Sequence, residues 1–166
     1  MGKAYRFALE FFSEAISRLD GVVDQSPILH HEEGAMYRAQ GKVIRATDSS
    51  WVVDFGIPAF RDVKAPEWAR PGVLVGGRVY IGIDPYFYLE YLKDEPGMPN
   101  LFRRWFVRRI LLETTPWQEI VQPNGQKLIT RADVPPTFVE VPRTDAWKDD
   151  AGRAHYVLDC EIRPAV

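Results

Sequence analysis

The stretch Gly41-Lys-Val-Ile-Arg-Ala-Thr-Asp-Ser-Ser-Trp-Val-Val-Asp-Phe-Gly-Ile57 decides the fold class of this chain. From Trp51 onward, large apolar side chains occupy every second position, so one face of the segment is strongly apolar. A period of two is typical of a β-strand with one buried face. Asp48-Ser-Ser50 is a turn sequence, and an earlier strand is predicted over residues 37–47. The stretch therefore predicts two strands joined by a turn.

The same pattern continues on the C-terminal side of this stretch. Residues 73–84 are predicted to form a third strand, in which Gly76-Gly77 indicates a bulge or a sharp bend. Residues 86–92 are also rich in β-forming side chains. Together these segments predict a barrel-like core over residues 36–92.

The last part of the chain, residues 103–163, is predicted to add further strands and hairpins. Asn124-Gly125 is a strong hairpin signal, so residues 117–121 and 127–130 are predicted to pair across it. Residues 102–115 fit either a helix or a strand, and we favour a strand over 107–115. The last two strands are expected over 137–141 and 155–163.

The N-terminal segment carries a different pattern. Apolar residues recur there at spacings of three and four, which predicts a helix over residues 4–20 that packs against the sheet. The residues of this stripe are Tyr5, Ala8, Leu9, Phe12, Ile16 and Leu19. Gly21 follows the pattern, as is typical of a residue after a helix end.

Three segments resemble the first strands of an OB-fold barrel. They are Gly41-Lys-Val-Ile-Arg-Ala46, Trp51-Val-Val-Asp-Phe-Gly56 and Gly77-Arg-Val-Tyr-Ile-Gly82. The resemblance covers residues 41–82 and implies a small antiparallel, partly closed barrel. It implies no contact residues and no function, because one fold carries many functions.

Composition and charge exclude several classes of protein. The chain has 166 residues, is 46% hydrophobic and 13% aromatic, and carries a formal charge of −2. One domain spanning residues 1–166 with a buried core is therefore expected. The single cysteine, Cys160, cannot form an intrachain disulfide, and no signal peptide is evident, so we expect a cytoplasmic location. No apolar run is long enough to span a bilayer, so we expect no association with a membrane.

A basic segment interleaved with aromatic residues is the most prominent local feature. Its members are Arg103, Arg104, Trp105, Phe106, Arg108 and Arg109. Arginines neutralise phosphates and aromatic rings stack on unpaired bases, which would suit a single-stranded nucleic acid. Alternatively, the aromatic residues belong to the core and the arginines pair with acids or form a protein interface.

A tyrosine-rich segment is the second candidate for a binding surface. Tyr86, Tyr88 and Tyr91 lie close together in sequence, and each hydroxyl needs a polar partner if the ring is buried. Core packing is the ordinary interpretation of such a cluster. We expect some of these rings to face a partner protein.

Metal and catalytic motifs are weak. His30-His31 and the two glutamates after them lie in a connector over residues 22–35, where neighbouring side chains diverge and cannot converge on one ion. Asp54 and Asp84 are acid–base candidates only if they meet in a pocket. Cys160 is expected to be a buried apolar-like residue. No metal and no cofactor are predicted.

These observations lead to one expectation with two alternatives. We expect an α+β, mainly β protein, with an N-terminal helix on a partly closed barrel, that acts without catalysis as a protein-binding module, such as an immunity or accessory factor of bacterial type. The first alternative is a single-stranded nucleic-acid-binding barrel that uses residues 103–109. The second is a hydrolase built on Asp54, Asp84 or His30-His31.

Overall fold

The computed structural model describes residues 4–13, 15–20, 25–84, 88–145 and 147–162. The chain forms two compact units, and each is described by itself. The first, Tyr5–Arg104, is called the barrel unit below. The second begins at Trp105 and is called the ribbon unit.

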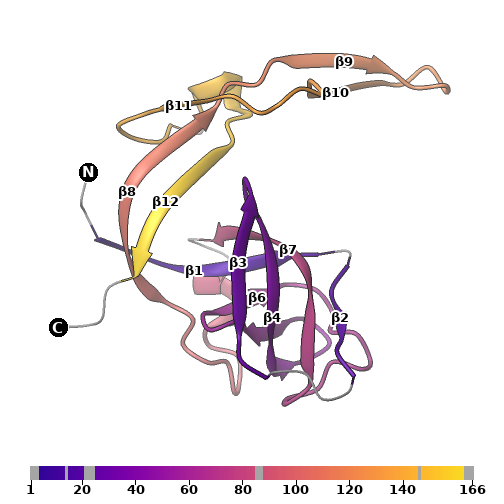
Figure 1. Cartoon of the computed structure of the whole chain (residues 1–166), viewed down its shortest axis with the longest axis vertical. Coiled ribbons are helices and arrows are strands. Elements are labelled where there is room, and N and C mark those ends of the chain that lie inside the picture. Colours follow the sequence, from indigo (N-terminus) through magenta and orange to yellow (C-terminus); the bar gives the residue numbers. More distant parts are fainter. Residues whose placement is uncertain (1–3, 14, 21–24, 85–87, 146, 163–166) are drawn as a thin grey trace. The chain divides into compact units, whose positions relative to one another are not determined.

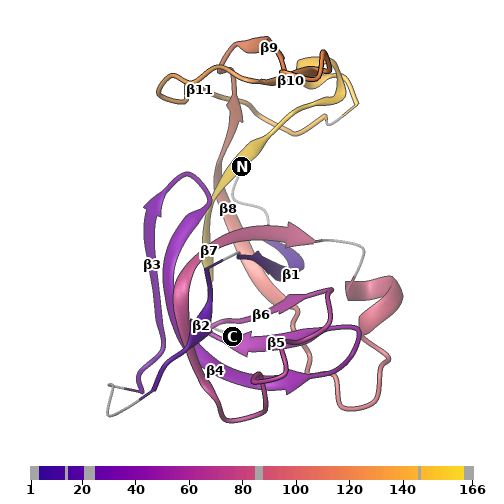
Figure 2. The ribbon, with the colours of Figure 1, turned by 90° about the vertical axis from the view of Figure 1, so that its right-hand side faces the viewer.

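Five strands of the barrel unit form a closed ring. They are β1 (Ala4–Phe12), β4 (Met36–Ala46), β5 (Trp51–Asp54), β6 (Pro58–Arg61) and β7 (Leu74–Asp84). β4, β5 and β6 pair as an antiparallel series, and β7 pairs with the other edge of β4. β1 closes the ring, because it pairs antiparallel with β7 and parallel with β6. Figure 2 shows these strands curving around one another.

Two further strands lie beside the ring. β2 (Ser17–Arg18) pairs with β7, and β3 (Ile28–Glu33) pairs with β4. A side chain at Gly77 would place its Cβ 2.4 Å from the carbonyl oxygen of Ala15, so the glycine permits the chain before β2 to approach β7. The glycine pair Gly76-Gly77, predicted to mark a bulge or a sharp bend, is therefore also explained by this close approach.

The predicted N-terminal helix is wrong. The chain is mostly β, and residues 4–12 form strand β1. The expected apolar stripe is not buried as a unit, since Tyr5 and Phe12 are 50% and 45% exposed. The buried residues instead include Phe7, Leu9 and Phe11, which alternate as in a strand. Ala8 is buried too, because the opposite face of β1 is also covered, and burial on both faces imitates helical spacing.

Aromatic side chains fill the ring. The Phe11 ring meets Trp51 and Phe55 edge to face, with centroids 5.0 and 5.6 Å apart. Val43 and Val53 are buried beside them, so the two strands of the deciding stretch both contribute to the core. Such pairs add about 0.5–1.5 kcal/mol each beyond the burial of apolar area.

A second apolar cluster covers the other face of β1, β5 and β6. It joins Val52 and Phe60 to residues of the segment 88–101, which includes the short helical turn η1 (Tyr88–Leu92). The members are Ala8, Val52, Phe60, Tyr88, Leu92 and Leu101. β5 is therefore buried on both faces, which explains its nearly continuous apolar sequence.

The ribbon unit is built around β8 (Arg103–Glu113), which begins at the end of the barrel unit. β12 (Tyr156–Ile162) pairs with β8 over most of its length, and β11 (Phe138–Glu140) pairs with residues near its end. β9 (Trp117–Val121) and β10 (Lys127–Arg131) form a separate two-stranded sheet. Figure 1 shows β8 beside β12 and β9 beside β10. The turn η2 (Asp149–Gly152) precedes β12.

Most strand predictions are confirmed. The strands expected over 37–47 and 73–84 are β4 and β7, and the segment 102–115 is a strand, β8. The hairpin expected across Asn124-Gly125 is β9–β10. Two further predictions are wrong: residues 88–92 of the segment rich in β-forming side chains form the helical turn η1, and part of the connector 22–35 forms strand β3. Its polar residues join the sheet because β4 is long enough to pair with both β3 and β5.

Candidate interaction surface

The β9–β10 hairpin has a regular turn that its sequence explains. Gly125 N–H donates to the carbonyl of Gln122, which closes a turn with Pro123 and Asn124 at its centre. Gly125 has φ of +81°, a conformation that glycine adopts without steric cost. The Asn124 side chain accepts a hydrogen bond from Gln126 N–H, so the turn is held by its own residues.

Apolar side chains of this hairpin face the solvent. Ile120, Val121, Leu128 and Ile129 are 42%, 62%, 48% and 47% exposed. We call these four residues the hairpin surface. Ile120 and Leu128 are directly paired and share one face, whereas Val121 and Ile129 lie on the other. Within the part of the chain that the structure describes, no third strand covers either edge of this sheet.

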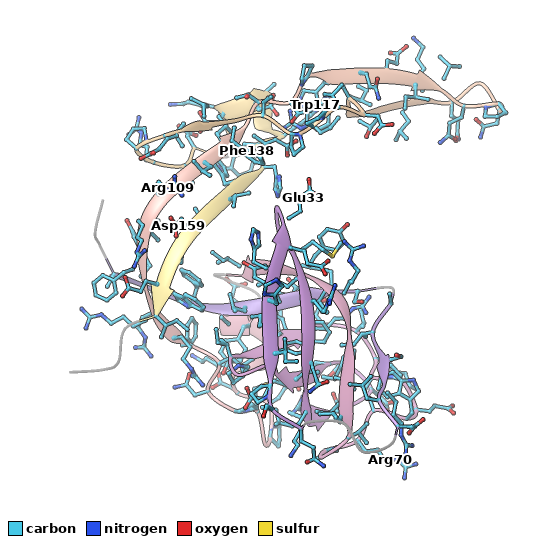
Figure 3. The ribbon with its side chains drawn as sticks, in the orientation of Figure 1. Glu33, Arg70, Arg109, Trp117, Phe138 and Asp159 are labelled. Carbon is cyan, nitrogen blue, oxygen red and sulfur yellow. The ribbon has the colours of Figure 1, made fainter. Side chains whose placement is uncertain are left out.

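A polar cluster fixes the base of the hairpin. The Trp117 indole N–H donates to both carboxylate oxygens of Asp150, at 2.9 and 3.0 Å. The Arg131 guanidinium lies 3.9 Å from the centre of the Trp117 ring and donates to Asp150 at 2.6 Å. It also donates to the carbonyl of Thr115 at 2.6 Å. We call Trp117, Arg131 and Asp150 the base cluster; Figure 3 labels Trp117, on the ribbon unit.

Glu113 extends this cluster towards β12. Its carboxylate lies 2.7 Å from Nδ1 of His155 and 3.8 Å from Nε of Arg131. Burial by itself would raise the pKa of Glu113, but hydrogen bonds from His155 and Thr115 and the charge of Arg131 outweigh burial and lower that pKa. The carboxylate is therefore held ionised.

The backbone that presents Asp150 is in a rare conformation. Asp150 and Ala151 have φ of +49° and +54°, and Gly152 follows with φ of +78°. Left-handed backbone at non-glycine residues costs about 1–3 kcal/mol and persists only where surrounding contacts hold it. Here the contacts of Asp150 with Trp117 and Arg131 supply that support.

The arginines predicted from the sequence are largely engaged by the protein itself. Arg108 pairs with Glu161 at 2.6 Å, and Arg109 pairs with Asp159 at 3.2 Å, both across the β8–β12 ladder (Figure 3). Arg103 donates to the backbone carbonyls of Asn100 and Phe102. Arg104 is exposed. The arginines thus do not converge on one place.

The aromatic residues predicted as a binding surface are divided among several environments. Tyr88 is 2% exposed, and its hydroxyl donates to the carbonyl of Pro99 and accepts from Leu101 N–H. Trp105 is buried as well, whereas Tyr91 is 64% exposed. Tyr86 lies outside the described residues.

The catalytic and metal candidates are not brought together into a recognisable centre. Asp54 accepts a hydrogen bond from Gly56 N–H and so stabilises a turn, and Asp84 ends β7. His31 bonds to the carbonyl of Gly34. Among the described residues, no group of acidic, histidine or cysteine side chains is arranged to hold a metal ion. Burial is the main cause that raises the pKa of the Cys160 thiol to about 11.

Two shallow pockets lie in the barrel unit. One, of about 500 Å³, is lined by Arg6, Tyr88, Lys93, Asp94, Met98, Asn100 and Phe102. The other, of about 540 Å³, is lined by residues of the loop that carries Lys64 and Arg70. Opposite charges occur in the lining of each, as Lys93 with Asp94 and Lys64 with Asp48. Because charges of both signs line each pocket, the lining residues do not indicate one class of ligand.

The residues of the base cluster and the hairpin surface were not singled out from the sequence. The Asn-Gly turn placed the hairpin correctly, but alternation does not distinguish a face that packs on the core from one exposed to water. Asp150 lies 19 residues beyond Arg131 and 33 beyond Trp117, so only the folded ribbon unit brings them together.

Comparisons with protein families, with curated proteins and with solved structures give no match. The assignment to the OB-fold class therefore stays a prediction, while the ring of five strands is a barrel-like arrangement. No helix among the described residues has the length and apolar character needed to cross a bilayer.

Proposed function

We propose that this chain is a non-enzymatic protein-binding module that contacts its partner through the hairpin surface. The observation that carries the proposal is the exposure of Ile120, Val121, Leu128 and Ile129 on a two-stranded sheet to which no other strand of the described residues is added. Exposed apolar side chains that neighbour one another, as Ile120 and Leu128 do on one face of this sheet, are typical of sites that another protein covers. A two-stranded hairpin is also marginally stable in water, so a covering partner would stabilise it.

The base cluster supports this assignment. Its hydrogen bonds and the cation–π contact hold the start of β9 and the end of β10 in one position without an apolar core beneath them. A surface that is ordered before binding loses less conformational entropy when the partner arrives. The Trp147 side chain, 92% exposed in the same unit, adds a further aromatic group of the kind favoured at interfaces.

The nucleic-acid alternative has less support from the geometry. Arg108 and Arg109 already pair with carboxylates on β12, so a phosphate would have to compete with Glu161 and Asp159. Trp105 is buried and presents no ring for a base to stack on. We therefore retain this alternative only as an outcome of the test below.

The test is affinity purification of the tagged full chain from its native cells at moderate salt, with and without nuclease. A double variant, Ile120→Thr with Leu128→Thr, removes the apolar pair from one face and keeps β-forming residues. We expect one stoichiometric protein partner that survives nuclease and is lost with this variant. The matched control is Ile44→Thr, at an exposed apolar position on β4 of the barrel unit.

Three results would contradict the proposal. Retention of the partner by the double variant would remove the hairpin surface from the interface. Loss of the partner with Ile44→Thr instead would move the interface to the barrel unit. Nucleic acid that co-purifies, and is lost at higher salt and with Arg104→Ala, would favour the nucleic-acid alternative.

A further inference from the structure

Among the residues that the structure describes, no other strand pairs with either backbone edge of the β9–β10 hairpin. Gln122 N–H donates to Gln126 and Ala132 N–H donates to Pro116, so these two pairs are hydrogen-bonded within the ladder. Bonded and non-bonded pairs alternate along antiparallel strands. The N–H and C=O groups of the intervening odd-numbered residues therefore point outward. On β9 these include Glu119, and on β10 they include Ile129.

The two edges carry opposite charges. Glu119 stands at the centre of the β9 edge, and Lys127 stands at the start of the β10 edge. Inside the hairpin these two side chains already form an ion pair at 2.9 Å. Arg131, the other cation of β10, is engaged by Asp150 in the base cluster. The charge on the β9 edge is therefore complementary to the charge on the β10 edge. Neither edge is complementary in charge to a second copy of itself.

This difference selects one way of joining two copies. Antiparallel pairing of β9 with β9 of a second copy, centred on Glu119, would place two like charges opposite each other, which is destabilising. Pairing of β10 with β10, centred on Ile129, would set Lys127 against Arg131 of the other copy. Pairing of β9 with β10 of a second copy repeats the register that the hairpin uses internally, with Glu119 diagonal to Lys127.

We propose that a second copy of this chain is a partner of the hairpin, and that the β9 edge of one copy pairs antiparallel with the β10 edge of the next. This inference rests on the proposed function, because it names a protein that binds the same hairpin, through its edges. Strand addition would satisfy the outward backbone groups and continue the apolar row of Ile120 and Leu128 from copy to copy. Since the contact joins two different edges, association does not stop at a dimer unless a ring closes.

The experiment measures the mass of the purified full chain by sedimentation velocity and light scattering from micromolar to millimolar concentration. We expect the mass to rise with concentration beyond that of a dimer. Ile129→Pro removes one outward N–H and no bond within the hairpin, and proline is tolerated on edge strands, so this variant should associate at least tenfold more weakly. Hydrogen exchange of the barrel strands should be unchanged in it.

A charge exchange supplies the matched controls. Glu119→Lys should weaken association, and the double variant with Lys127→Glu should restore it, since opposite charges again meet between the edges. Glu140→Lys, the same change at an exposed position on β11, should leave association unaltered.

A wild-type chain that remains monomeric over the whole range would overturn the inference. Association that Ile129→Pro leaves unchanged would also overturn it. So would a mass that stops at that of a dimer, if Glu119→Lys makes this dimer associate more strongly. These results would not decide the proposed function, because capture of a different protein that depends on Ile120 and Leu128 is measured separately.

Discussion

The barrel unit and the ribbon unit contain similar strands but are stabilised in different ways. In the barrel unit, Phe11, Trp51 and Phe55 meet inside a closed ring, and a second apolar cluster covers part of its outside. In the ribbon unit, the hairpin is anchored by Arg131 and Asp150 and exposes its apolar residues. Alternating apolar sequence therefore serves burial in one unit and exposure in the other.

The contrast teaches that the two units should respond to different perturbations. Burial of apolar area is nearly independent of pH and salt, so the barrel unit depends on the shape of its core. Charged hydrogen bonds depend on protonation and on their geometry, so the hairpin base depends on both. The predictions below separate the two by measuring each unit with its own probe.

The largest expected effect is in the core of the ring. Phe11→Ala should lower the free energy of unfolding by about 3–5 kcal/mol, because it removes a buried ring and leaves a cavity. Chemical denaturation followed by circular dichroism measures this loss. Should that variant fail to fold, Phe11→Leu keeps more volume and should cost less. Ile120→Ala in the hairpin is the control and should change the free energy of unfolding by about 0.5 kcal/mol or less. Equal losses of stability in the two variants would contradict the difference between the units.

The next effect concerns the base cluster. Asp150→Asn keeps the shape of the side chain and tolerates left-handed backbone, but removes the charge that binds Arg131. We expect a loss of about 1–3 kcal/mol, confined to the ribbon unit. Hydrogen exchange should show faster exchange of β9 and β10 amides and unchanged exchange in β4 and β7. Faster exchange in both units would show that the cluster is not a local anchor.

A smaller effect should appear on acidification. The pKa of Glu113 is lower in the folded protein than its ordinary value of 4.5. A lowered pKa means that the unfolded state binds the proton more readily, so the stabilisation is present above the ordinary value and is lost as the pH falls through the folded pKa. The ring Hε1 resonance of His155, whose Nδ1 lies 2.7 Å from the Glu113 carboxylate, should shift over that acidic range in the wild type. It should not shift in Glu113→Gln, and a shift of equal size there would assign the titration to another group.

The smallest effect should come from the exposed pair of Arg108 and Glu161. Its 2.6 Å contact lies at the surface, where water and salt screen the attraction. A double-mutant cycle with alanine at both positions should give a coupling close to the error of the denaturation experiment. A large coupling would show that this pair stabilises the β8–β12 ladder as the base cluster stabilises the hairpin.

The positions of most barrel strands and of the hairpin could be predicted from the sequence, but the distribution of buried residues could not. Turn residues such as Asn124-Gly125 act locally, so the pairing of β9 with β10 could be predicted, although not its register. The N-terminal strand could not, because Ala8 is buried by residues 88–101, far along the chain, and this adds a false helical spacing. The engagement of Arg109 by Asp159 depends on the β8–β12 register, which no local signal specifies.

The closure of the ring by β1 has a consequence for how the chain folds. The partner of Leu9 on β7 is Ile83, and its partner on β6 is Ala59. β1 therefore completes its pairing only when β7 is also present, and contacts between residues so far apart in the sequence make folding slow. Until β7 has been synthesised, Phe7, Leu9 and Phe11 have no ring to enter. During that interval their apolar side chains remain exposed, and exposed apolar segments of an incompletely folded chain favour aggregation.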